Sequence, residues 1–161
     1  MQWSAPLALG PGLTIGPAPG SYGSSTYAAD LQQLHAAGFR SLVSLIKDPE
    51  YAHLVDESSR EEALLQCEEL GMATLHVPIE DFSAPQSSDI DEIGRFIQRQ
   101  TAPVYLHCMA GLGRSGTVAA ALLIQQGMST EDAILLVRWA RPGAIQSDVQ
   151  ERFLSALRND E

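Results

Sequence analysis

The residues with the clearest capacity for chemistry are Cys108 and Arg114, and two of the five residues between them are glycines. They lie in a stretch that runs from His107 to Gly116 and joins an apolar segment, Val104 to Leu106, to a helix-like run. Glycines let the backbone turn tightly so that successive N–H groups point inward, and a following helix adds its positive N-terminal end. The stretch therefore predicts a cradle that binds an anion.

A cysteine and an arginine have different tasks in such a cradle. The thiolate is favoured at the start of a helix and is the nucleophilic form of cysteine, so Cys108 is the candidate nucleophile. Arg114 would bind two oxygens of the anion. The alternative is a tight strand-to-helix turn with an incidental buried cysteine, and this bare spacing arises by chance roughly one time in ten. The buried strand before the loop, the glycines inside it and the helix after it favour the chemical interpretation.

The elements that must position the loop alternate between strand-like and helix-like segments. This alternation is typical of an α/β domain with a mostly parallel central sheet flanked by helices. Apolar segments predict strands over 13–15, 41–46, 74–77 and 103–107. Periodicity, capping residues and terminal glycines predict helices over about 26–37, 59–70, 88–100 and 117–126. Polar loops around 48–50 and over 78–87 would connect them.

Length and composition indicate one globular domain over residues 1–161. The chain is 45% hydrophobic and 19% charged, which is the range of an ordinary globular protein and not of a disordered or membrane one. No charged residue precedes Asp30, and the first 25 residues hold four prolines and five glycines, so they predict a loop-rich entry segment.

The charge balance bears on partners and location. A net charge of -10 argues against nucleic acid or an anionic membrane surface as the main partner, although it does not exclude an anionic substrate. No apolar run is long enough to span a bilayer, and the N-terminus lacks the cationic and apolar regions of a secretory signal. The chain also has only two cysteines, which are too few for a disulfide framework and fit a reducing compartment. We therefore expect a cytoplasmic protein.

The loop resembles the signature of the cysteine-dependent protein tyrosine and dual-specificity phosphatase superfamily, which is His-Cys-x5-Arg-Ser/Thr. The match is residue for residue at His107, Cys108, Gly111, Gly113, Arg114, Ser115 and Gly116. Its Ala-Gly-Leu-Gly-Arg-Ser-Gly form is similar to the kinase-associated and cell-division-cycle branch and to compact archaeal and bacterial tyrosine phosphatases. The resemblance implies a dual-specificity-phosphatase-like fold with the phosphate loop between a buried strand and a helix.

Two further segments support the resemblance. Residues 77–85 resemble the general-acid loop Pro-Ile-x-Asp-x-x-x-Pro, which implies that Asp81 is the acid. Adjacent residues of an extended segment point to opposite sides, so Glu80 and Asp81 cannot share that role. Residues 138–150 resemble an Arg-Pro-Gly-x-Ile-Gln segment that orders water in the second chemical step, which implies this task for Gln146.

The resemblance also implies the reaction and the residues that bind the phosphoryl group. Cys108 would attack phosphorus and form a phosphocysteine, while Arg114 and the backbone of the loop would bind the phosphate oxygens. The remaining loop residues in this phosphate-binding set are Met109, Ala110, Gly111, Leu112 and Gly113. No metal or cofactor is required, because the loop itself offsets the phosphate charge.

Several residues have two interpretations each. The resemblance implies that Ser115 eases departure of the thiolate, whereas the sequence alone fits a helix cap. His107 would orient the cysteine loop or be a buried, satisfied histidine. Gln150 would order water or form a capping box with Ser147. Cys67 could form a protective disulfide with Cys108 on oxidation or be an ordinary buried helical cysteine.

Two arginines that follow the loop also have two interpretations. Arg138 and Arg141 would attract the phosphoryl group or form solvent-facing ion pairs, and the second interpretation is favoured because surface ion pairs are common.

Together these features predict a metal-independent phosphatase that hydrolyses phosphotyrosine in phosphoproteins. A dual-specificity range that includes phosphoserine or phosphothreonine is the nearest alternative. Met109 and Leu112 stand where phosphoinositide-directed relatives carry lysines, which argues against a lipid substrate. A phosphoprotein-binding pseudophosphatase and a phosphatase of non-protein phosphomonoesters are further alternatives.

Overall fold

The computed structural model describes residues 1–57 and 59–157 and contains a four-stranded, fully parallel sheet. The strands are β1 (Leu13–Gly16), β2 (Ser41–Ser44), β3 (Ala73–His76) and β4 (Val104–His107), and their order in the sheet is β1-β4-β2-β3. β4 lies between β1 and β2, in register from Val104 to His107. Parallel strands buried on both faces are rich in apolar residues, and β1, β2 and β4 are buried throughout.

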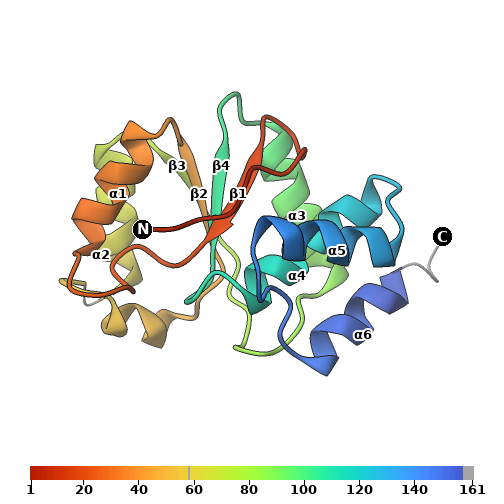
Figure 1. Ribbon diagram of the computed structural model, residues 1–161. Helices are drawn as coiled ribbons and strands as arrows, with labels where there is room; N and C mark the ends of the chain where they lie inside the picture. Colours follow the sequence, from red (N-terminus) through yellow and green to blue (C-terminus); the bar gives the residue numbers. More distant parts are fainter. Residues whose placement is uncertain (58, 158–161) are drawn as a thin grey trace.

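Helices cover both faces of the sheet (Figure 1). On one side lie α1 (Tyr27–Ala36) and α2 (Arg60–Glu69), and on the other lie α3 (Ser87–Gln98), α4 (Gly113–Gln125), α5 (Thr130–Ala140) and α6 (Asp148–Leu157). A short 3-10 helix, η1 (Asp48–His53), follows β2. This arrangement confirms the predicted α/β class with its parallel sheet. None of the helices in the described residues is both long and apolar enough to cross a bilayer.

Helix α4 is the central element of the second layer and packs against α3, α5, α6 and β1. Every residue from Gly113 to Ile124 is buried, and small residues allow the close packing. At Gly116, a Cβ atom would lie 2.9 Å from the Cβ of Ala144, which is closer than real Cβ contacts come. The helix that follows the phosphate-loop motif is therefore held rigidly from all sides.

Most expected elements are present, with shifts at their ends. The cap predicted at Ser59 is confirmed, because its hydroxyl accepts from the N–H group of Glu62. The hydroxyl of Thr26 caps α1 in the same way by accepting from the N–H group of Ala29. Two expectations were wrong. The segment that begins at Asp48 is the helix η1 instead of a loop, and the helix after the motif begins at Gly113 and not at Thr117. Arg114 and Ser115 thus belong to the first turn of α4.

Candidate active site

The phosphate-loop motif lies at the carboxyl end of the interior strand β4. His107 is the last residue of β4, the loop spans 108–112, and α4 begins at Gly113. In parallel α/β sheets, ligands bind in the crevice outside the carboxyl ends of the strands, near helix N-termini. The fold therefore places Cys108 where such a site is expected.

Glycine is required at Gly111. Its φ of 74° is in the left-handed region, and a Cβ atom there would lie 2.1 Å from the carbonyl carbon of Gly16 at the end of β1. The chain can turn at this position and approach β1 only because the side chain is absent.

Within the described part of the chain, the carbonyl groups of the loop backbone are hydrogen-bonded to other segments, whereas its N–H groups are not. The carbonyl of Met109 accepts from the N–H of Ala18, and those of Ala110 and Gly111 accept from the guanidinium of Arg141. The N–H groups of residues 109–112 have no acceptor among the described residues. Unpaired N–H groups in a folded loop are rare, and a run of them forms a nest that binds anions.

Cys108 lies in this nest with 3% of its surface exposed, and its Sγ is 3.4 Å from the Oγ of Ser115. His107 is fully buried, and its Nδ1 donates to the carbonyl of Cys108 at 2.9 Å. Burial lowers the pKa of His107 to about 4, so the imidazole is neutral at neutral pH. The structure thus places the thiol beside the hydroxyl of Ser115 and fixes the imidazole against the carbonyl of Cys108.

Arg114 is 1% exposed and is held by two other segments of the chain. Its Nη1 and Nη2 donate to the two carboxylate oxygens of Glu50 at 2.8 and 2.9 Å, and Nη1 also donates to the carbonyl of Ile79 at 3.0 Å. Burial alone would lower the pKa of Arg114, but its hydrogen bonds to Glu50 and the charge interactions with Cys108, Glu50 and Asp81 together outweigh it and raise the pKa. Its Nε is buried and has no partner among the described residues, so this donor is free for a ligand.

The sequence interpretation missed Glu50 as a site residue. This carboxylate also accepts from the backbone N–H of Lys47 at 2.8 Å, within the first turn of η1. Burial alone would raise the pKa of Glu50, and the hydrogen bonds from Arg114 and Lys47 outweigh it and hold the pKa below its usual value. A buried arginine needs an acidic partner, which is the one signal that points to such a residue.

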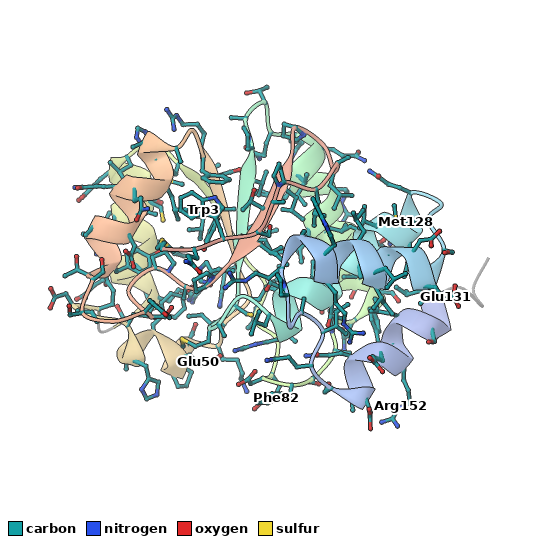
Figure 2. The ribbon with its side chains drawn as sticks, in the orientation of Figure 1. Trp3, Glu50, Phe82, Met128, Glu131 and Arg152 are labelled. Atoms are coloured by element: carbon teal, nitrogen blue, oxygen red, sulfur yellow. The ribbon has the colours of Figure 1, made fainter. Side chains whose placement is uncertain are left out.

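The two adjacent carboxylates of the loop after β3 point to different partners. Asp81 Oδ1 lies 3.4 Å from Arg114 Nη2, and 54% of the Asp81 side chain is exposed. Glu80 instead pairs with Lys47 at the surface. Phe82 has a φ of 61°, which is strained for a bulky residue, and its carbonyl accepts from Ser147 Oγ at 2.7 Å. Figure 2 shows Phe82 at the same edge of the molecule as Glu50.

The segment before α6 borders the same loop. A Cβ atom on Gly113 would lie 2.7 Å from Gln146 Oε1, so the amide of Gln146 reaches the start of α4. Gln150 and Ser147 form the predicted capping box, because each accepts from the backbone N–H of the other at 3.1 and 3.2 Å. Gln150 Nε2 also donates to the carbonyl of Ser83, so the structure uses this side chain to connect the segment to the acid loop.

The remaining candidates have structural contacts. Arg138 pairs with Glu151 at 2.9 Å and donates to the carbonyls of Ala144 and Ile145, as the ion-pair interpretation predicts. Among the described residues Arg141 has no such partner, and it instead donates to carbonyls of the phosphate loop. Cys67 is buried in α2 with its Sγ 3.6 Å from the hydroxyl of Tyr27, and burial raises its pKa to about 11.

Comparison with known proteins gives relatives of one kind. The family model described as "Tc-R-P: Polymorphic toxin system, DSP-PTPase phosphatase" matches residues 18–128. Human protein tyrosine phosphatase type IVA 3 is 34% identical over 82 residues, which is 48% of this chain and 47% of that protein. Mouse protein tyrosine phosphatase type IVA 2 is 34% identical over 85 residues, covering 50% of this chain and 51% of that protein. The chain spans about half the length of the curated relatives it matches.

Two solved structures are similar over nearly the whole chain. The active form of Tk-PTP has a TM-score of 0.73 and 34% sequence identity. The match covers 93% of this chain and 92% of the Tk-PTP chain. Kinase-associated phosphatase, solved with serine in place of its catalytic-site cysteine, has a TM-score of 0.84 and 25% sequence identity. The match covers 99% of this chain and 95% of that one. The chain therefore belongs to the DSP-PTPase phosphatase family of polymorphic toxin systems, within the cysteine-dependent dual-specificity phosphatase superfamily.

Proposed function

We propose that this protein is a metal-independent phosphatase that hydrolyses phosphotyrosine in phosphoproteins through a phosphocysteine intermediate. One observation carries the proposal: among the described residues, the loop that holds the buried thiol of Cys108 has free N–H donors at 109–112, and the buried Arg114 at the start of α4 has a free Nε. A phosphate monoester brings about two negative charges, and this many unpaired donors can offset them.

In the first step, the thiolate of Cys108 attacks phosphorus opposite the ester oxygen. The sulfur–phosphorus bond forms as the bond to the leaving oxygen breaks, and Asp81 gives its proton to that oxygen. The position of Asp81 beside Arg114 supports this assignment, because Arg114 would bind the same phosphoryl group. Glu50 acts as a positioning residue, since its two hydrogen bonds fix the plane of the Arg114 guanidinium.

In the second step, water attacks phosphorus and the phosphocysteine breaks down to inorganic phosphate. Asp81, now a carboxylate, takes the proton from water, and Gln146 orients that water beside the start of α4. The thiolate of Cys108 leaves with its pair of electrons, and the hydroxyl of Ser115, 3.4 Å away, stabilises it with a hydrogen bond. His107 keeps the carbonyl of Cys108 oriented through Nδ1.

The experiment that tests this function compares kcat/KM for phosphotyrosine, phosphothreonine and phosphoinositide substrates, in chelator throughout. We expect hydrolysis of para-nitrophenyl phosphate without added metal, inhibition by vanadate and the highest kcat/KM for phosphotyrosine peptides. Comparable turnover of phosphothreonine peptides would instead assign dual specificity. Binding of phosphopeptides without any turnover would identify a pseudophosphatase, and activity that returns only with zinc or magnesium would contradict the mechanism.

A further inference from the structure

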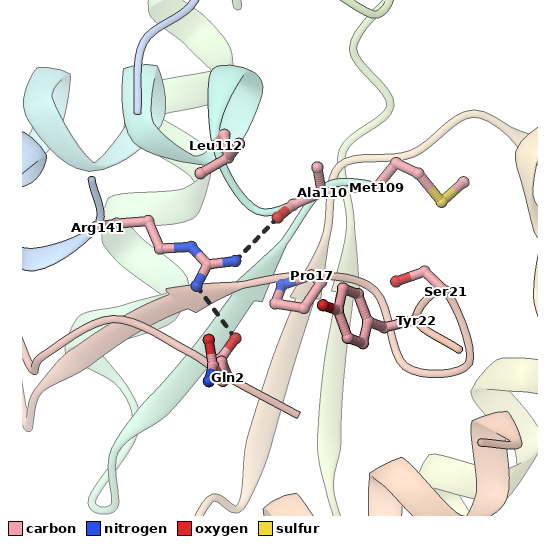
Figure 3. Close-up of a pocket in the computed structure, with 8 residues that line it drawn as sticks. All are labelled: Gln2, Pro17, Ser21, Tyr22, Met109, Ala110, Leu112 and Arg141. Carbon is pink, nitrogen blue, oxygen red and sulfur yellow. Dashed lines mark hydrogen bonds between the residues drawn. The ribbon is translucent and has the colours of Figure 1, made fainter. Parts of the chain in front are cut away.

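A pocket lies beside the phosphate loop. It has a volume of about 330 Å³ and is lined by Gln2, Pro17, Ser21, Tyr22, Met109, Ala110, Leu112 and Arg141 (Figure 3). Three of these residues belong to the phosphate loop itself, so one wall of the pocket is the outer face of the cradle. The volume is at the small end of the range for ligand pockets and is large enough for one side chain of a bound peptide.

The walls of this pocket offer three kinds of surface. Pro17, Met109 and Leu112 present apolar atoms, and the ring of Tyr22 is 75% exposed. An exposed aromatic ring beside apolar neighbours marks a binding surface more often than an isolated one does. Figure 3 shows the Tyr22 ring and the Arg141 guanidinium on opposite sides of the Pro17 position.

The remaining wall is the guanidinium of Arg141, which has no acidic partner among the described residues. Arg141 donates to the carbonyls of Gln2, Ala110 and Gly111 at 3.2, 3.1 and 3.3 Å. Within residues 1–57 and 59–157, no carboxylate lies within ion-pairing distance of it. The guanidinium is therefore fixed at the pocket wall by neutral acceptors, with no acidic partner beside it among the described residues.

These surfaces fit an aromatic occupant. The negative face of an aromatic ring is attracted to a guanidinium, packs edge-on or offset against a tyrosine ring, and makes favourable contacts with a methionine sulfur. A carboxylate is disfavoured, because the apolar atoms of Pro17, Met109 and Leu112 would remove it from water. Since the pocket shares its wall with the cradle, a side chain next to the phosphorylated residue of a substrate lies close enough to enter it.

We propose that this pocket binds an aromatic side chain that lies next to the phosphotyrosine in the substrate, between Tyr22 and Arg141. The proposal rests on the phosphotyrosine phosphatase activity argued above and names the substrate class that this activity favours. Tyr22 is then a specificity residue, and Arg141 both supports the phosphate loop and forms the cationic wall of the pocket.

The test uses two series of phosphotyrosine peptides. One series varies the residue before the phosphotyrosine and the other varies the residue after it, and the varied residue is Ala, Leu, Phe or Glu. At one position we expect Phe to raise kcat/KM roughly tenfold over Ala, with a smaller gain for Leu and none for Glu. Tyr22→Ala should remove most of this preference, and Tyr22→Phe should keep it. Leu135→Ala, which truncates an exposed apolar side chain on α5, is the matched control and should leave the preference unchanged.

Binding of the same peptides to the Cys108→Ser variant separates the pocket from the chemistry. We expect the same order of affinities there, with Phe above Leu and Ala. Equal rates and equal affinities for all peptides would overturn the pocket while leaving the phosphatase activity intact, and a preference for Glu would assign an acidic occupant instead. A Phe preference that survives Tyr22→Ala in full would place the aromatic side chain elsewhere. Loss of turnover for every peptide, with the affinity order kept, would contradict the proposed function and not the pocket.

Discussion

Glu50 and Arg114, 64 positions apart in the sequence, are joined by two parallel hydrogen bonds of 2.8 and 2.9 Å. This geometry uses Nη1 and Nη2 and leaves Nε of Arg114 without a partner in the part of the chain that the structure describes, so the guanidinium is fixed while one of its donors is free. A paired carboxylate–guanidinium contact gives geometric precision as well as energy. The helix η1 thus determines how the arginine of the phosphate loop faces a ligand.

Glu50→Gln should lower both stability and catalysis. Loss of the charged partner of a buried arginine should reduce the free energy of unfolding by roughly 2 to 3 kcal/mol at pH 7 and kcat/KM by ~10²-fold. Because the folded-state pKa of Glu50 is below its usual value, the ion pair stabilises the fold at neutral pH and is lost as pH falls through that lowered value. Urea denaturation at pH 7 and pH 3 should show a difference from wild type that shrinks in acid. Glu61→Gln, at an exposed carboxylate, is the control, and an equal effect of both variants would refute the special role of Glu50.

Asp81→Asn and Glu80→Gln should differ in how the rate depends on the leaving group. A general acid matters most for a poor leaving group, so Asp81→Asn should slow tyrosyl phosphate by ~10²-fold or more and an activated aryl phosphate far less. Glu80→Gln should do neither, because Glu80 faces Lys47 at the surface. A series of aryl phosphates of graded leaving-group pKa measures this. If only Glu80→Gln made the rate depend more steeply on the leaving-group pKa, the general acid would be Glu80 and not Asp81.

His107 should make the fold less stable in mild acid. Its folded-state pKa of about 4 is below the usual 6.5, so the unfolded chain binds a proton that the folded protein does not. The free energy of unfolding should therefore fall as pH falls between 6.5 and 4, by roughly 2 kcal/mol from pH 7 to pH 5. Urea denaturation of wild type and His107→Gln at both pH values tests this. An equal pH dependence in the two proteins would show that His107 is not the titrating group.

Gln146→Ala should slow the second step selectively. If the amide orders the attacking water, the phosphocysteine should accumulate and kcat should fall roughly tenfold to hundredfold, while kcat/KM changes little. Stopped-flow measurement with para-nitrophenyl phosphate should then show a burst of one nitrophenol per enzyme. A fall in kcat/KM without a burst would place Gln146 in the first step.

The sequence predicts the strands and the phosphate loop well because these depend on local patterns. Apolar segments located all four strands to within about two residues, and the glycine-rich motif identified the turn at Gly111. The start of α4 was expected four positions too late, because Gly113 and Gly116 weaken helix propensity and only the packing of α4 compensates for it.

Long-range pairing is what the sequence leaves open. Glu50 is one of 20 acidic residues, and nothing near it in the chain distinguishes it from the exposed carboxylates of neighbouring segments. Its partner is chosen by the order of the strands, which brings the end of β2 beside the end of β4. The contacts of Arg141 with the phosphate loop depend in the same way on how α5 packs against α4.

The Cys108→Ser variant shows whether Cys108 is the nucleophile within the anion-binding loop. Steady-state hydrolysis of para-nitrophenyl phosphate should fall roughly 10⁴-fold or more, because a serine hydroxyl is not ionised at neutral pH. Binding of phosphate or vanadate should persist, since the N–H groups of the loop and Arg114 remain. Cys67→Ser is the matched control and should keep its activity. Substantial turnover by a pure Cys108→Ser preparation would contradict the mechanism.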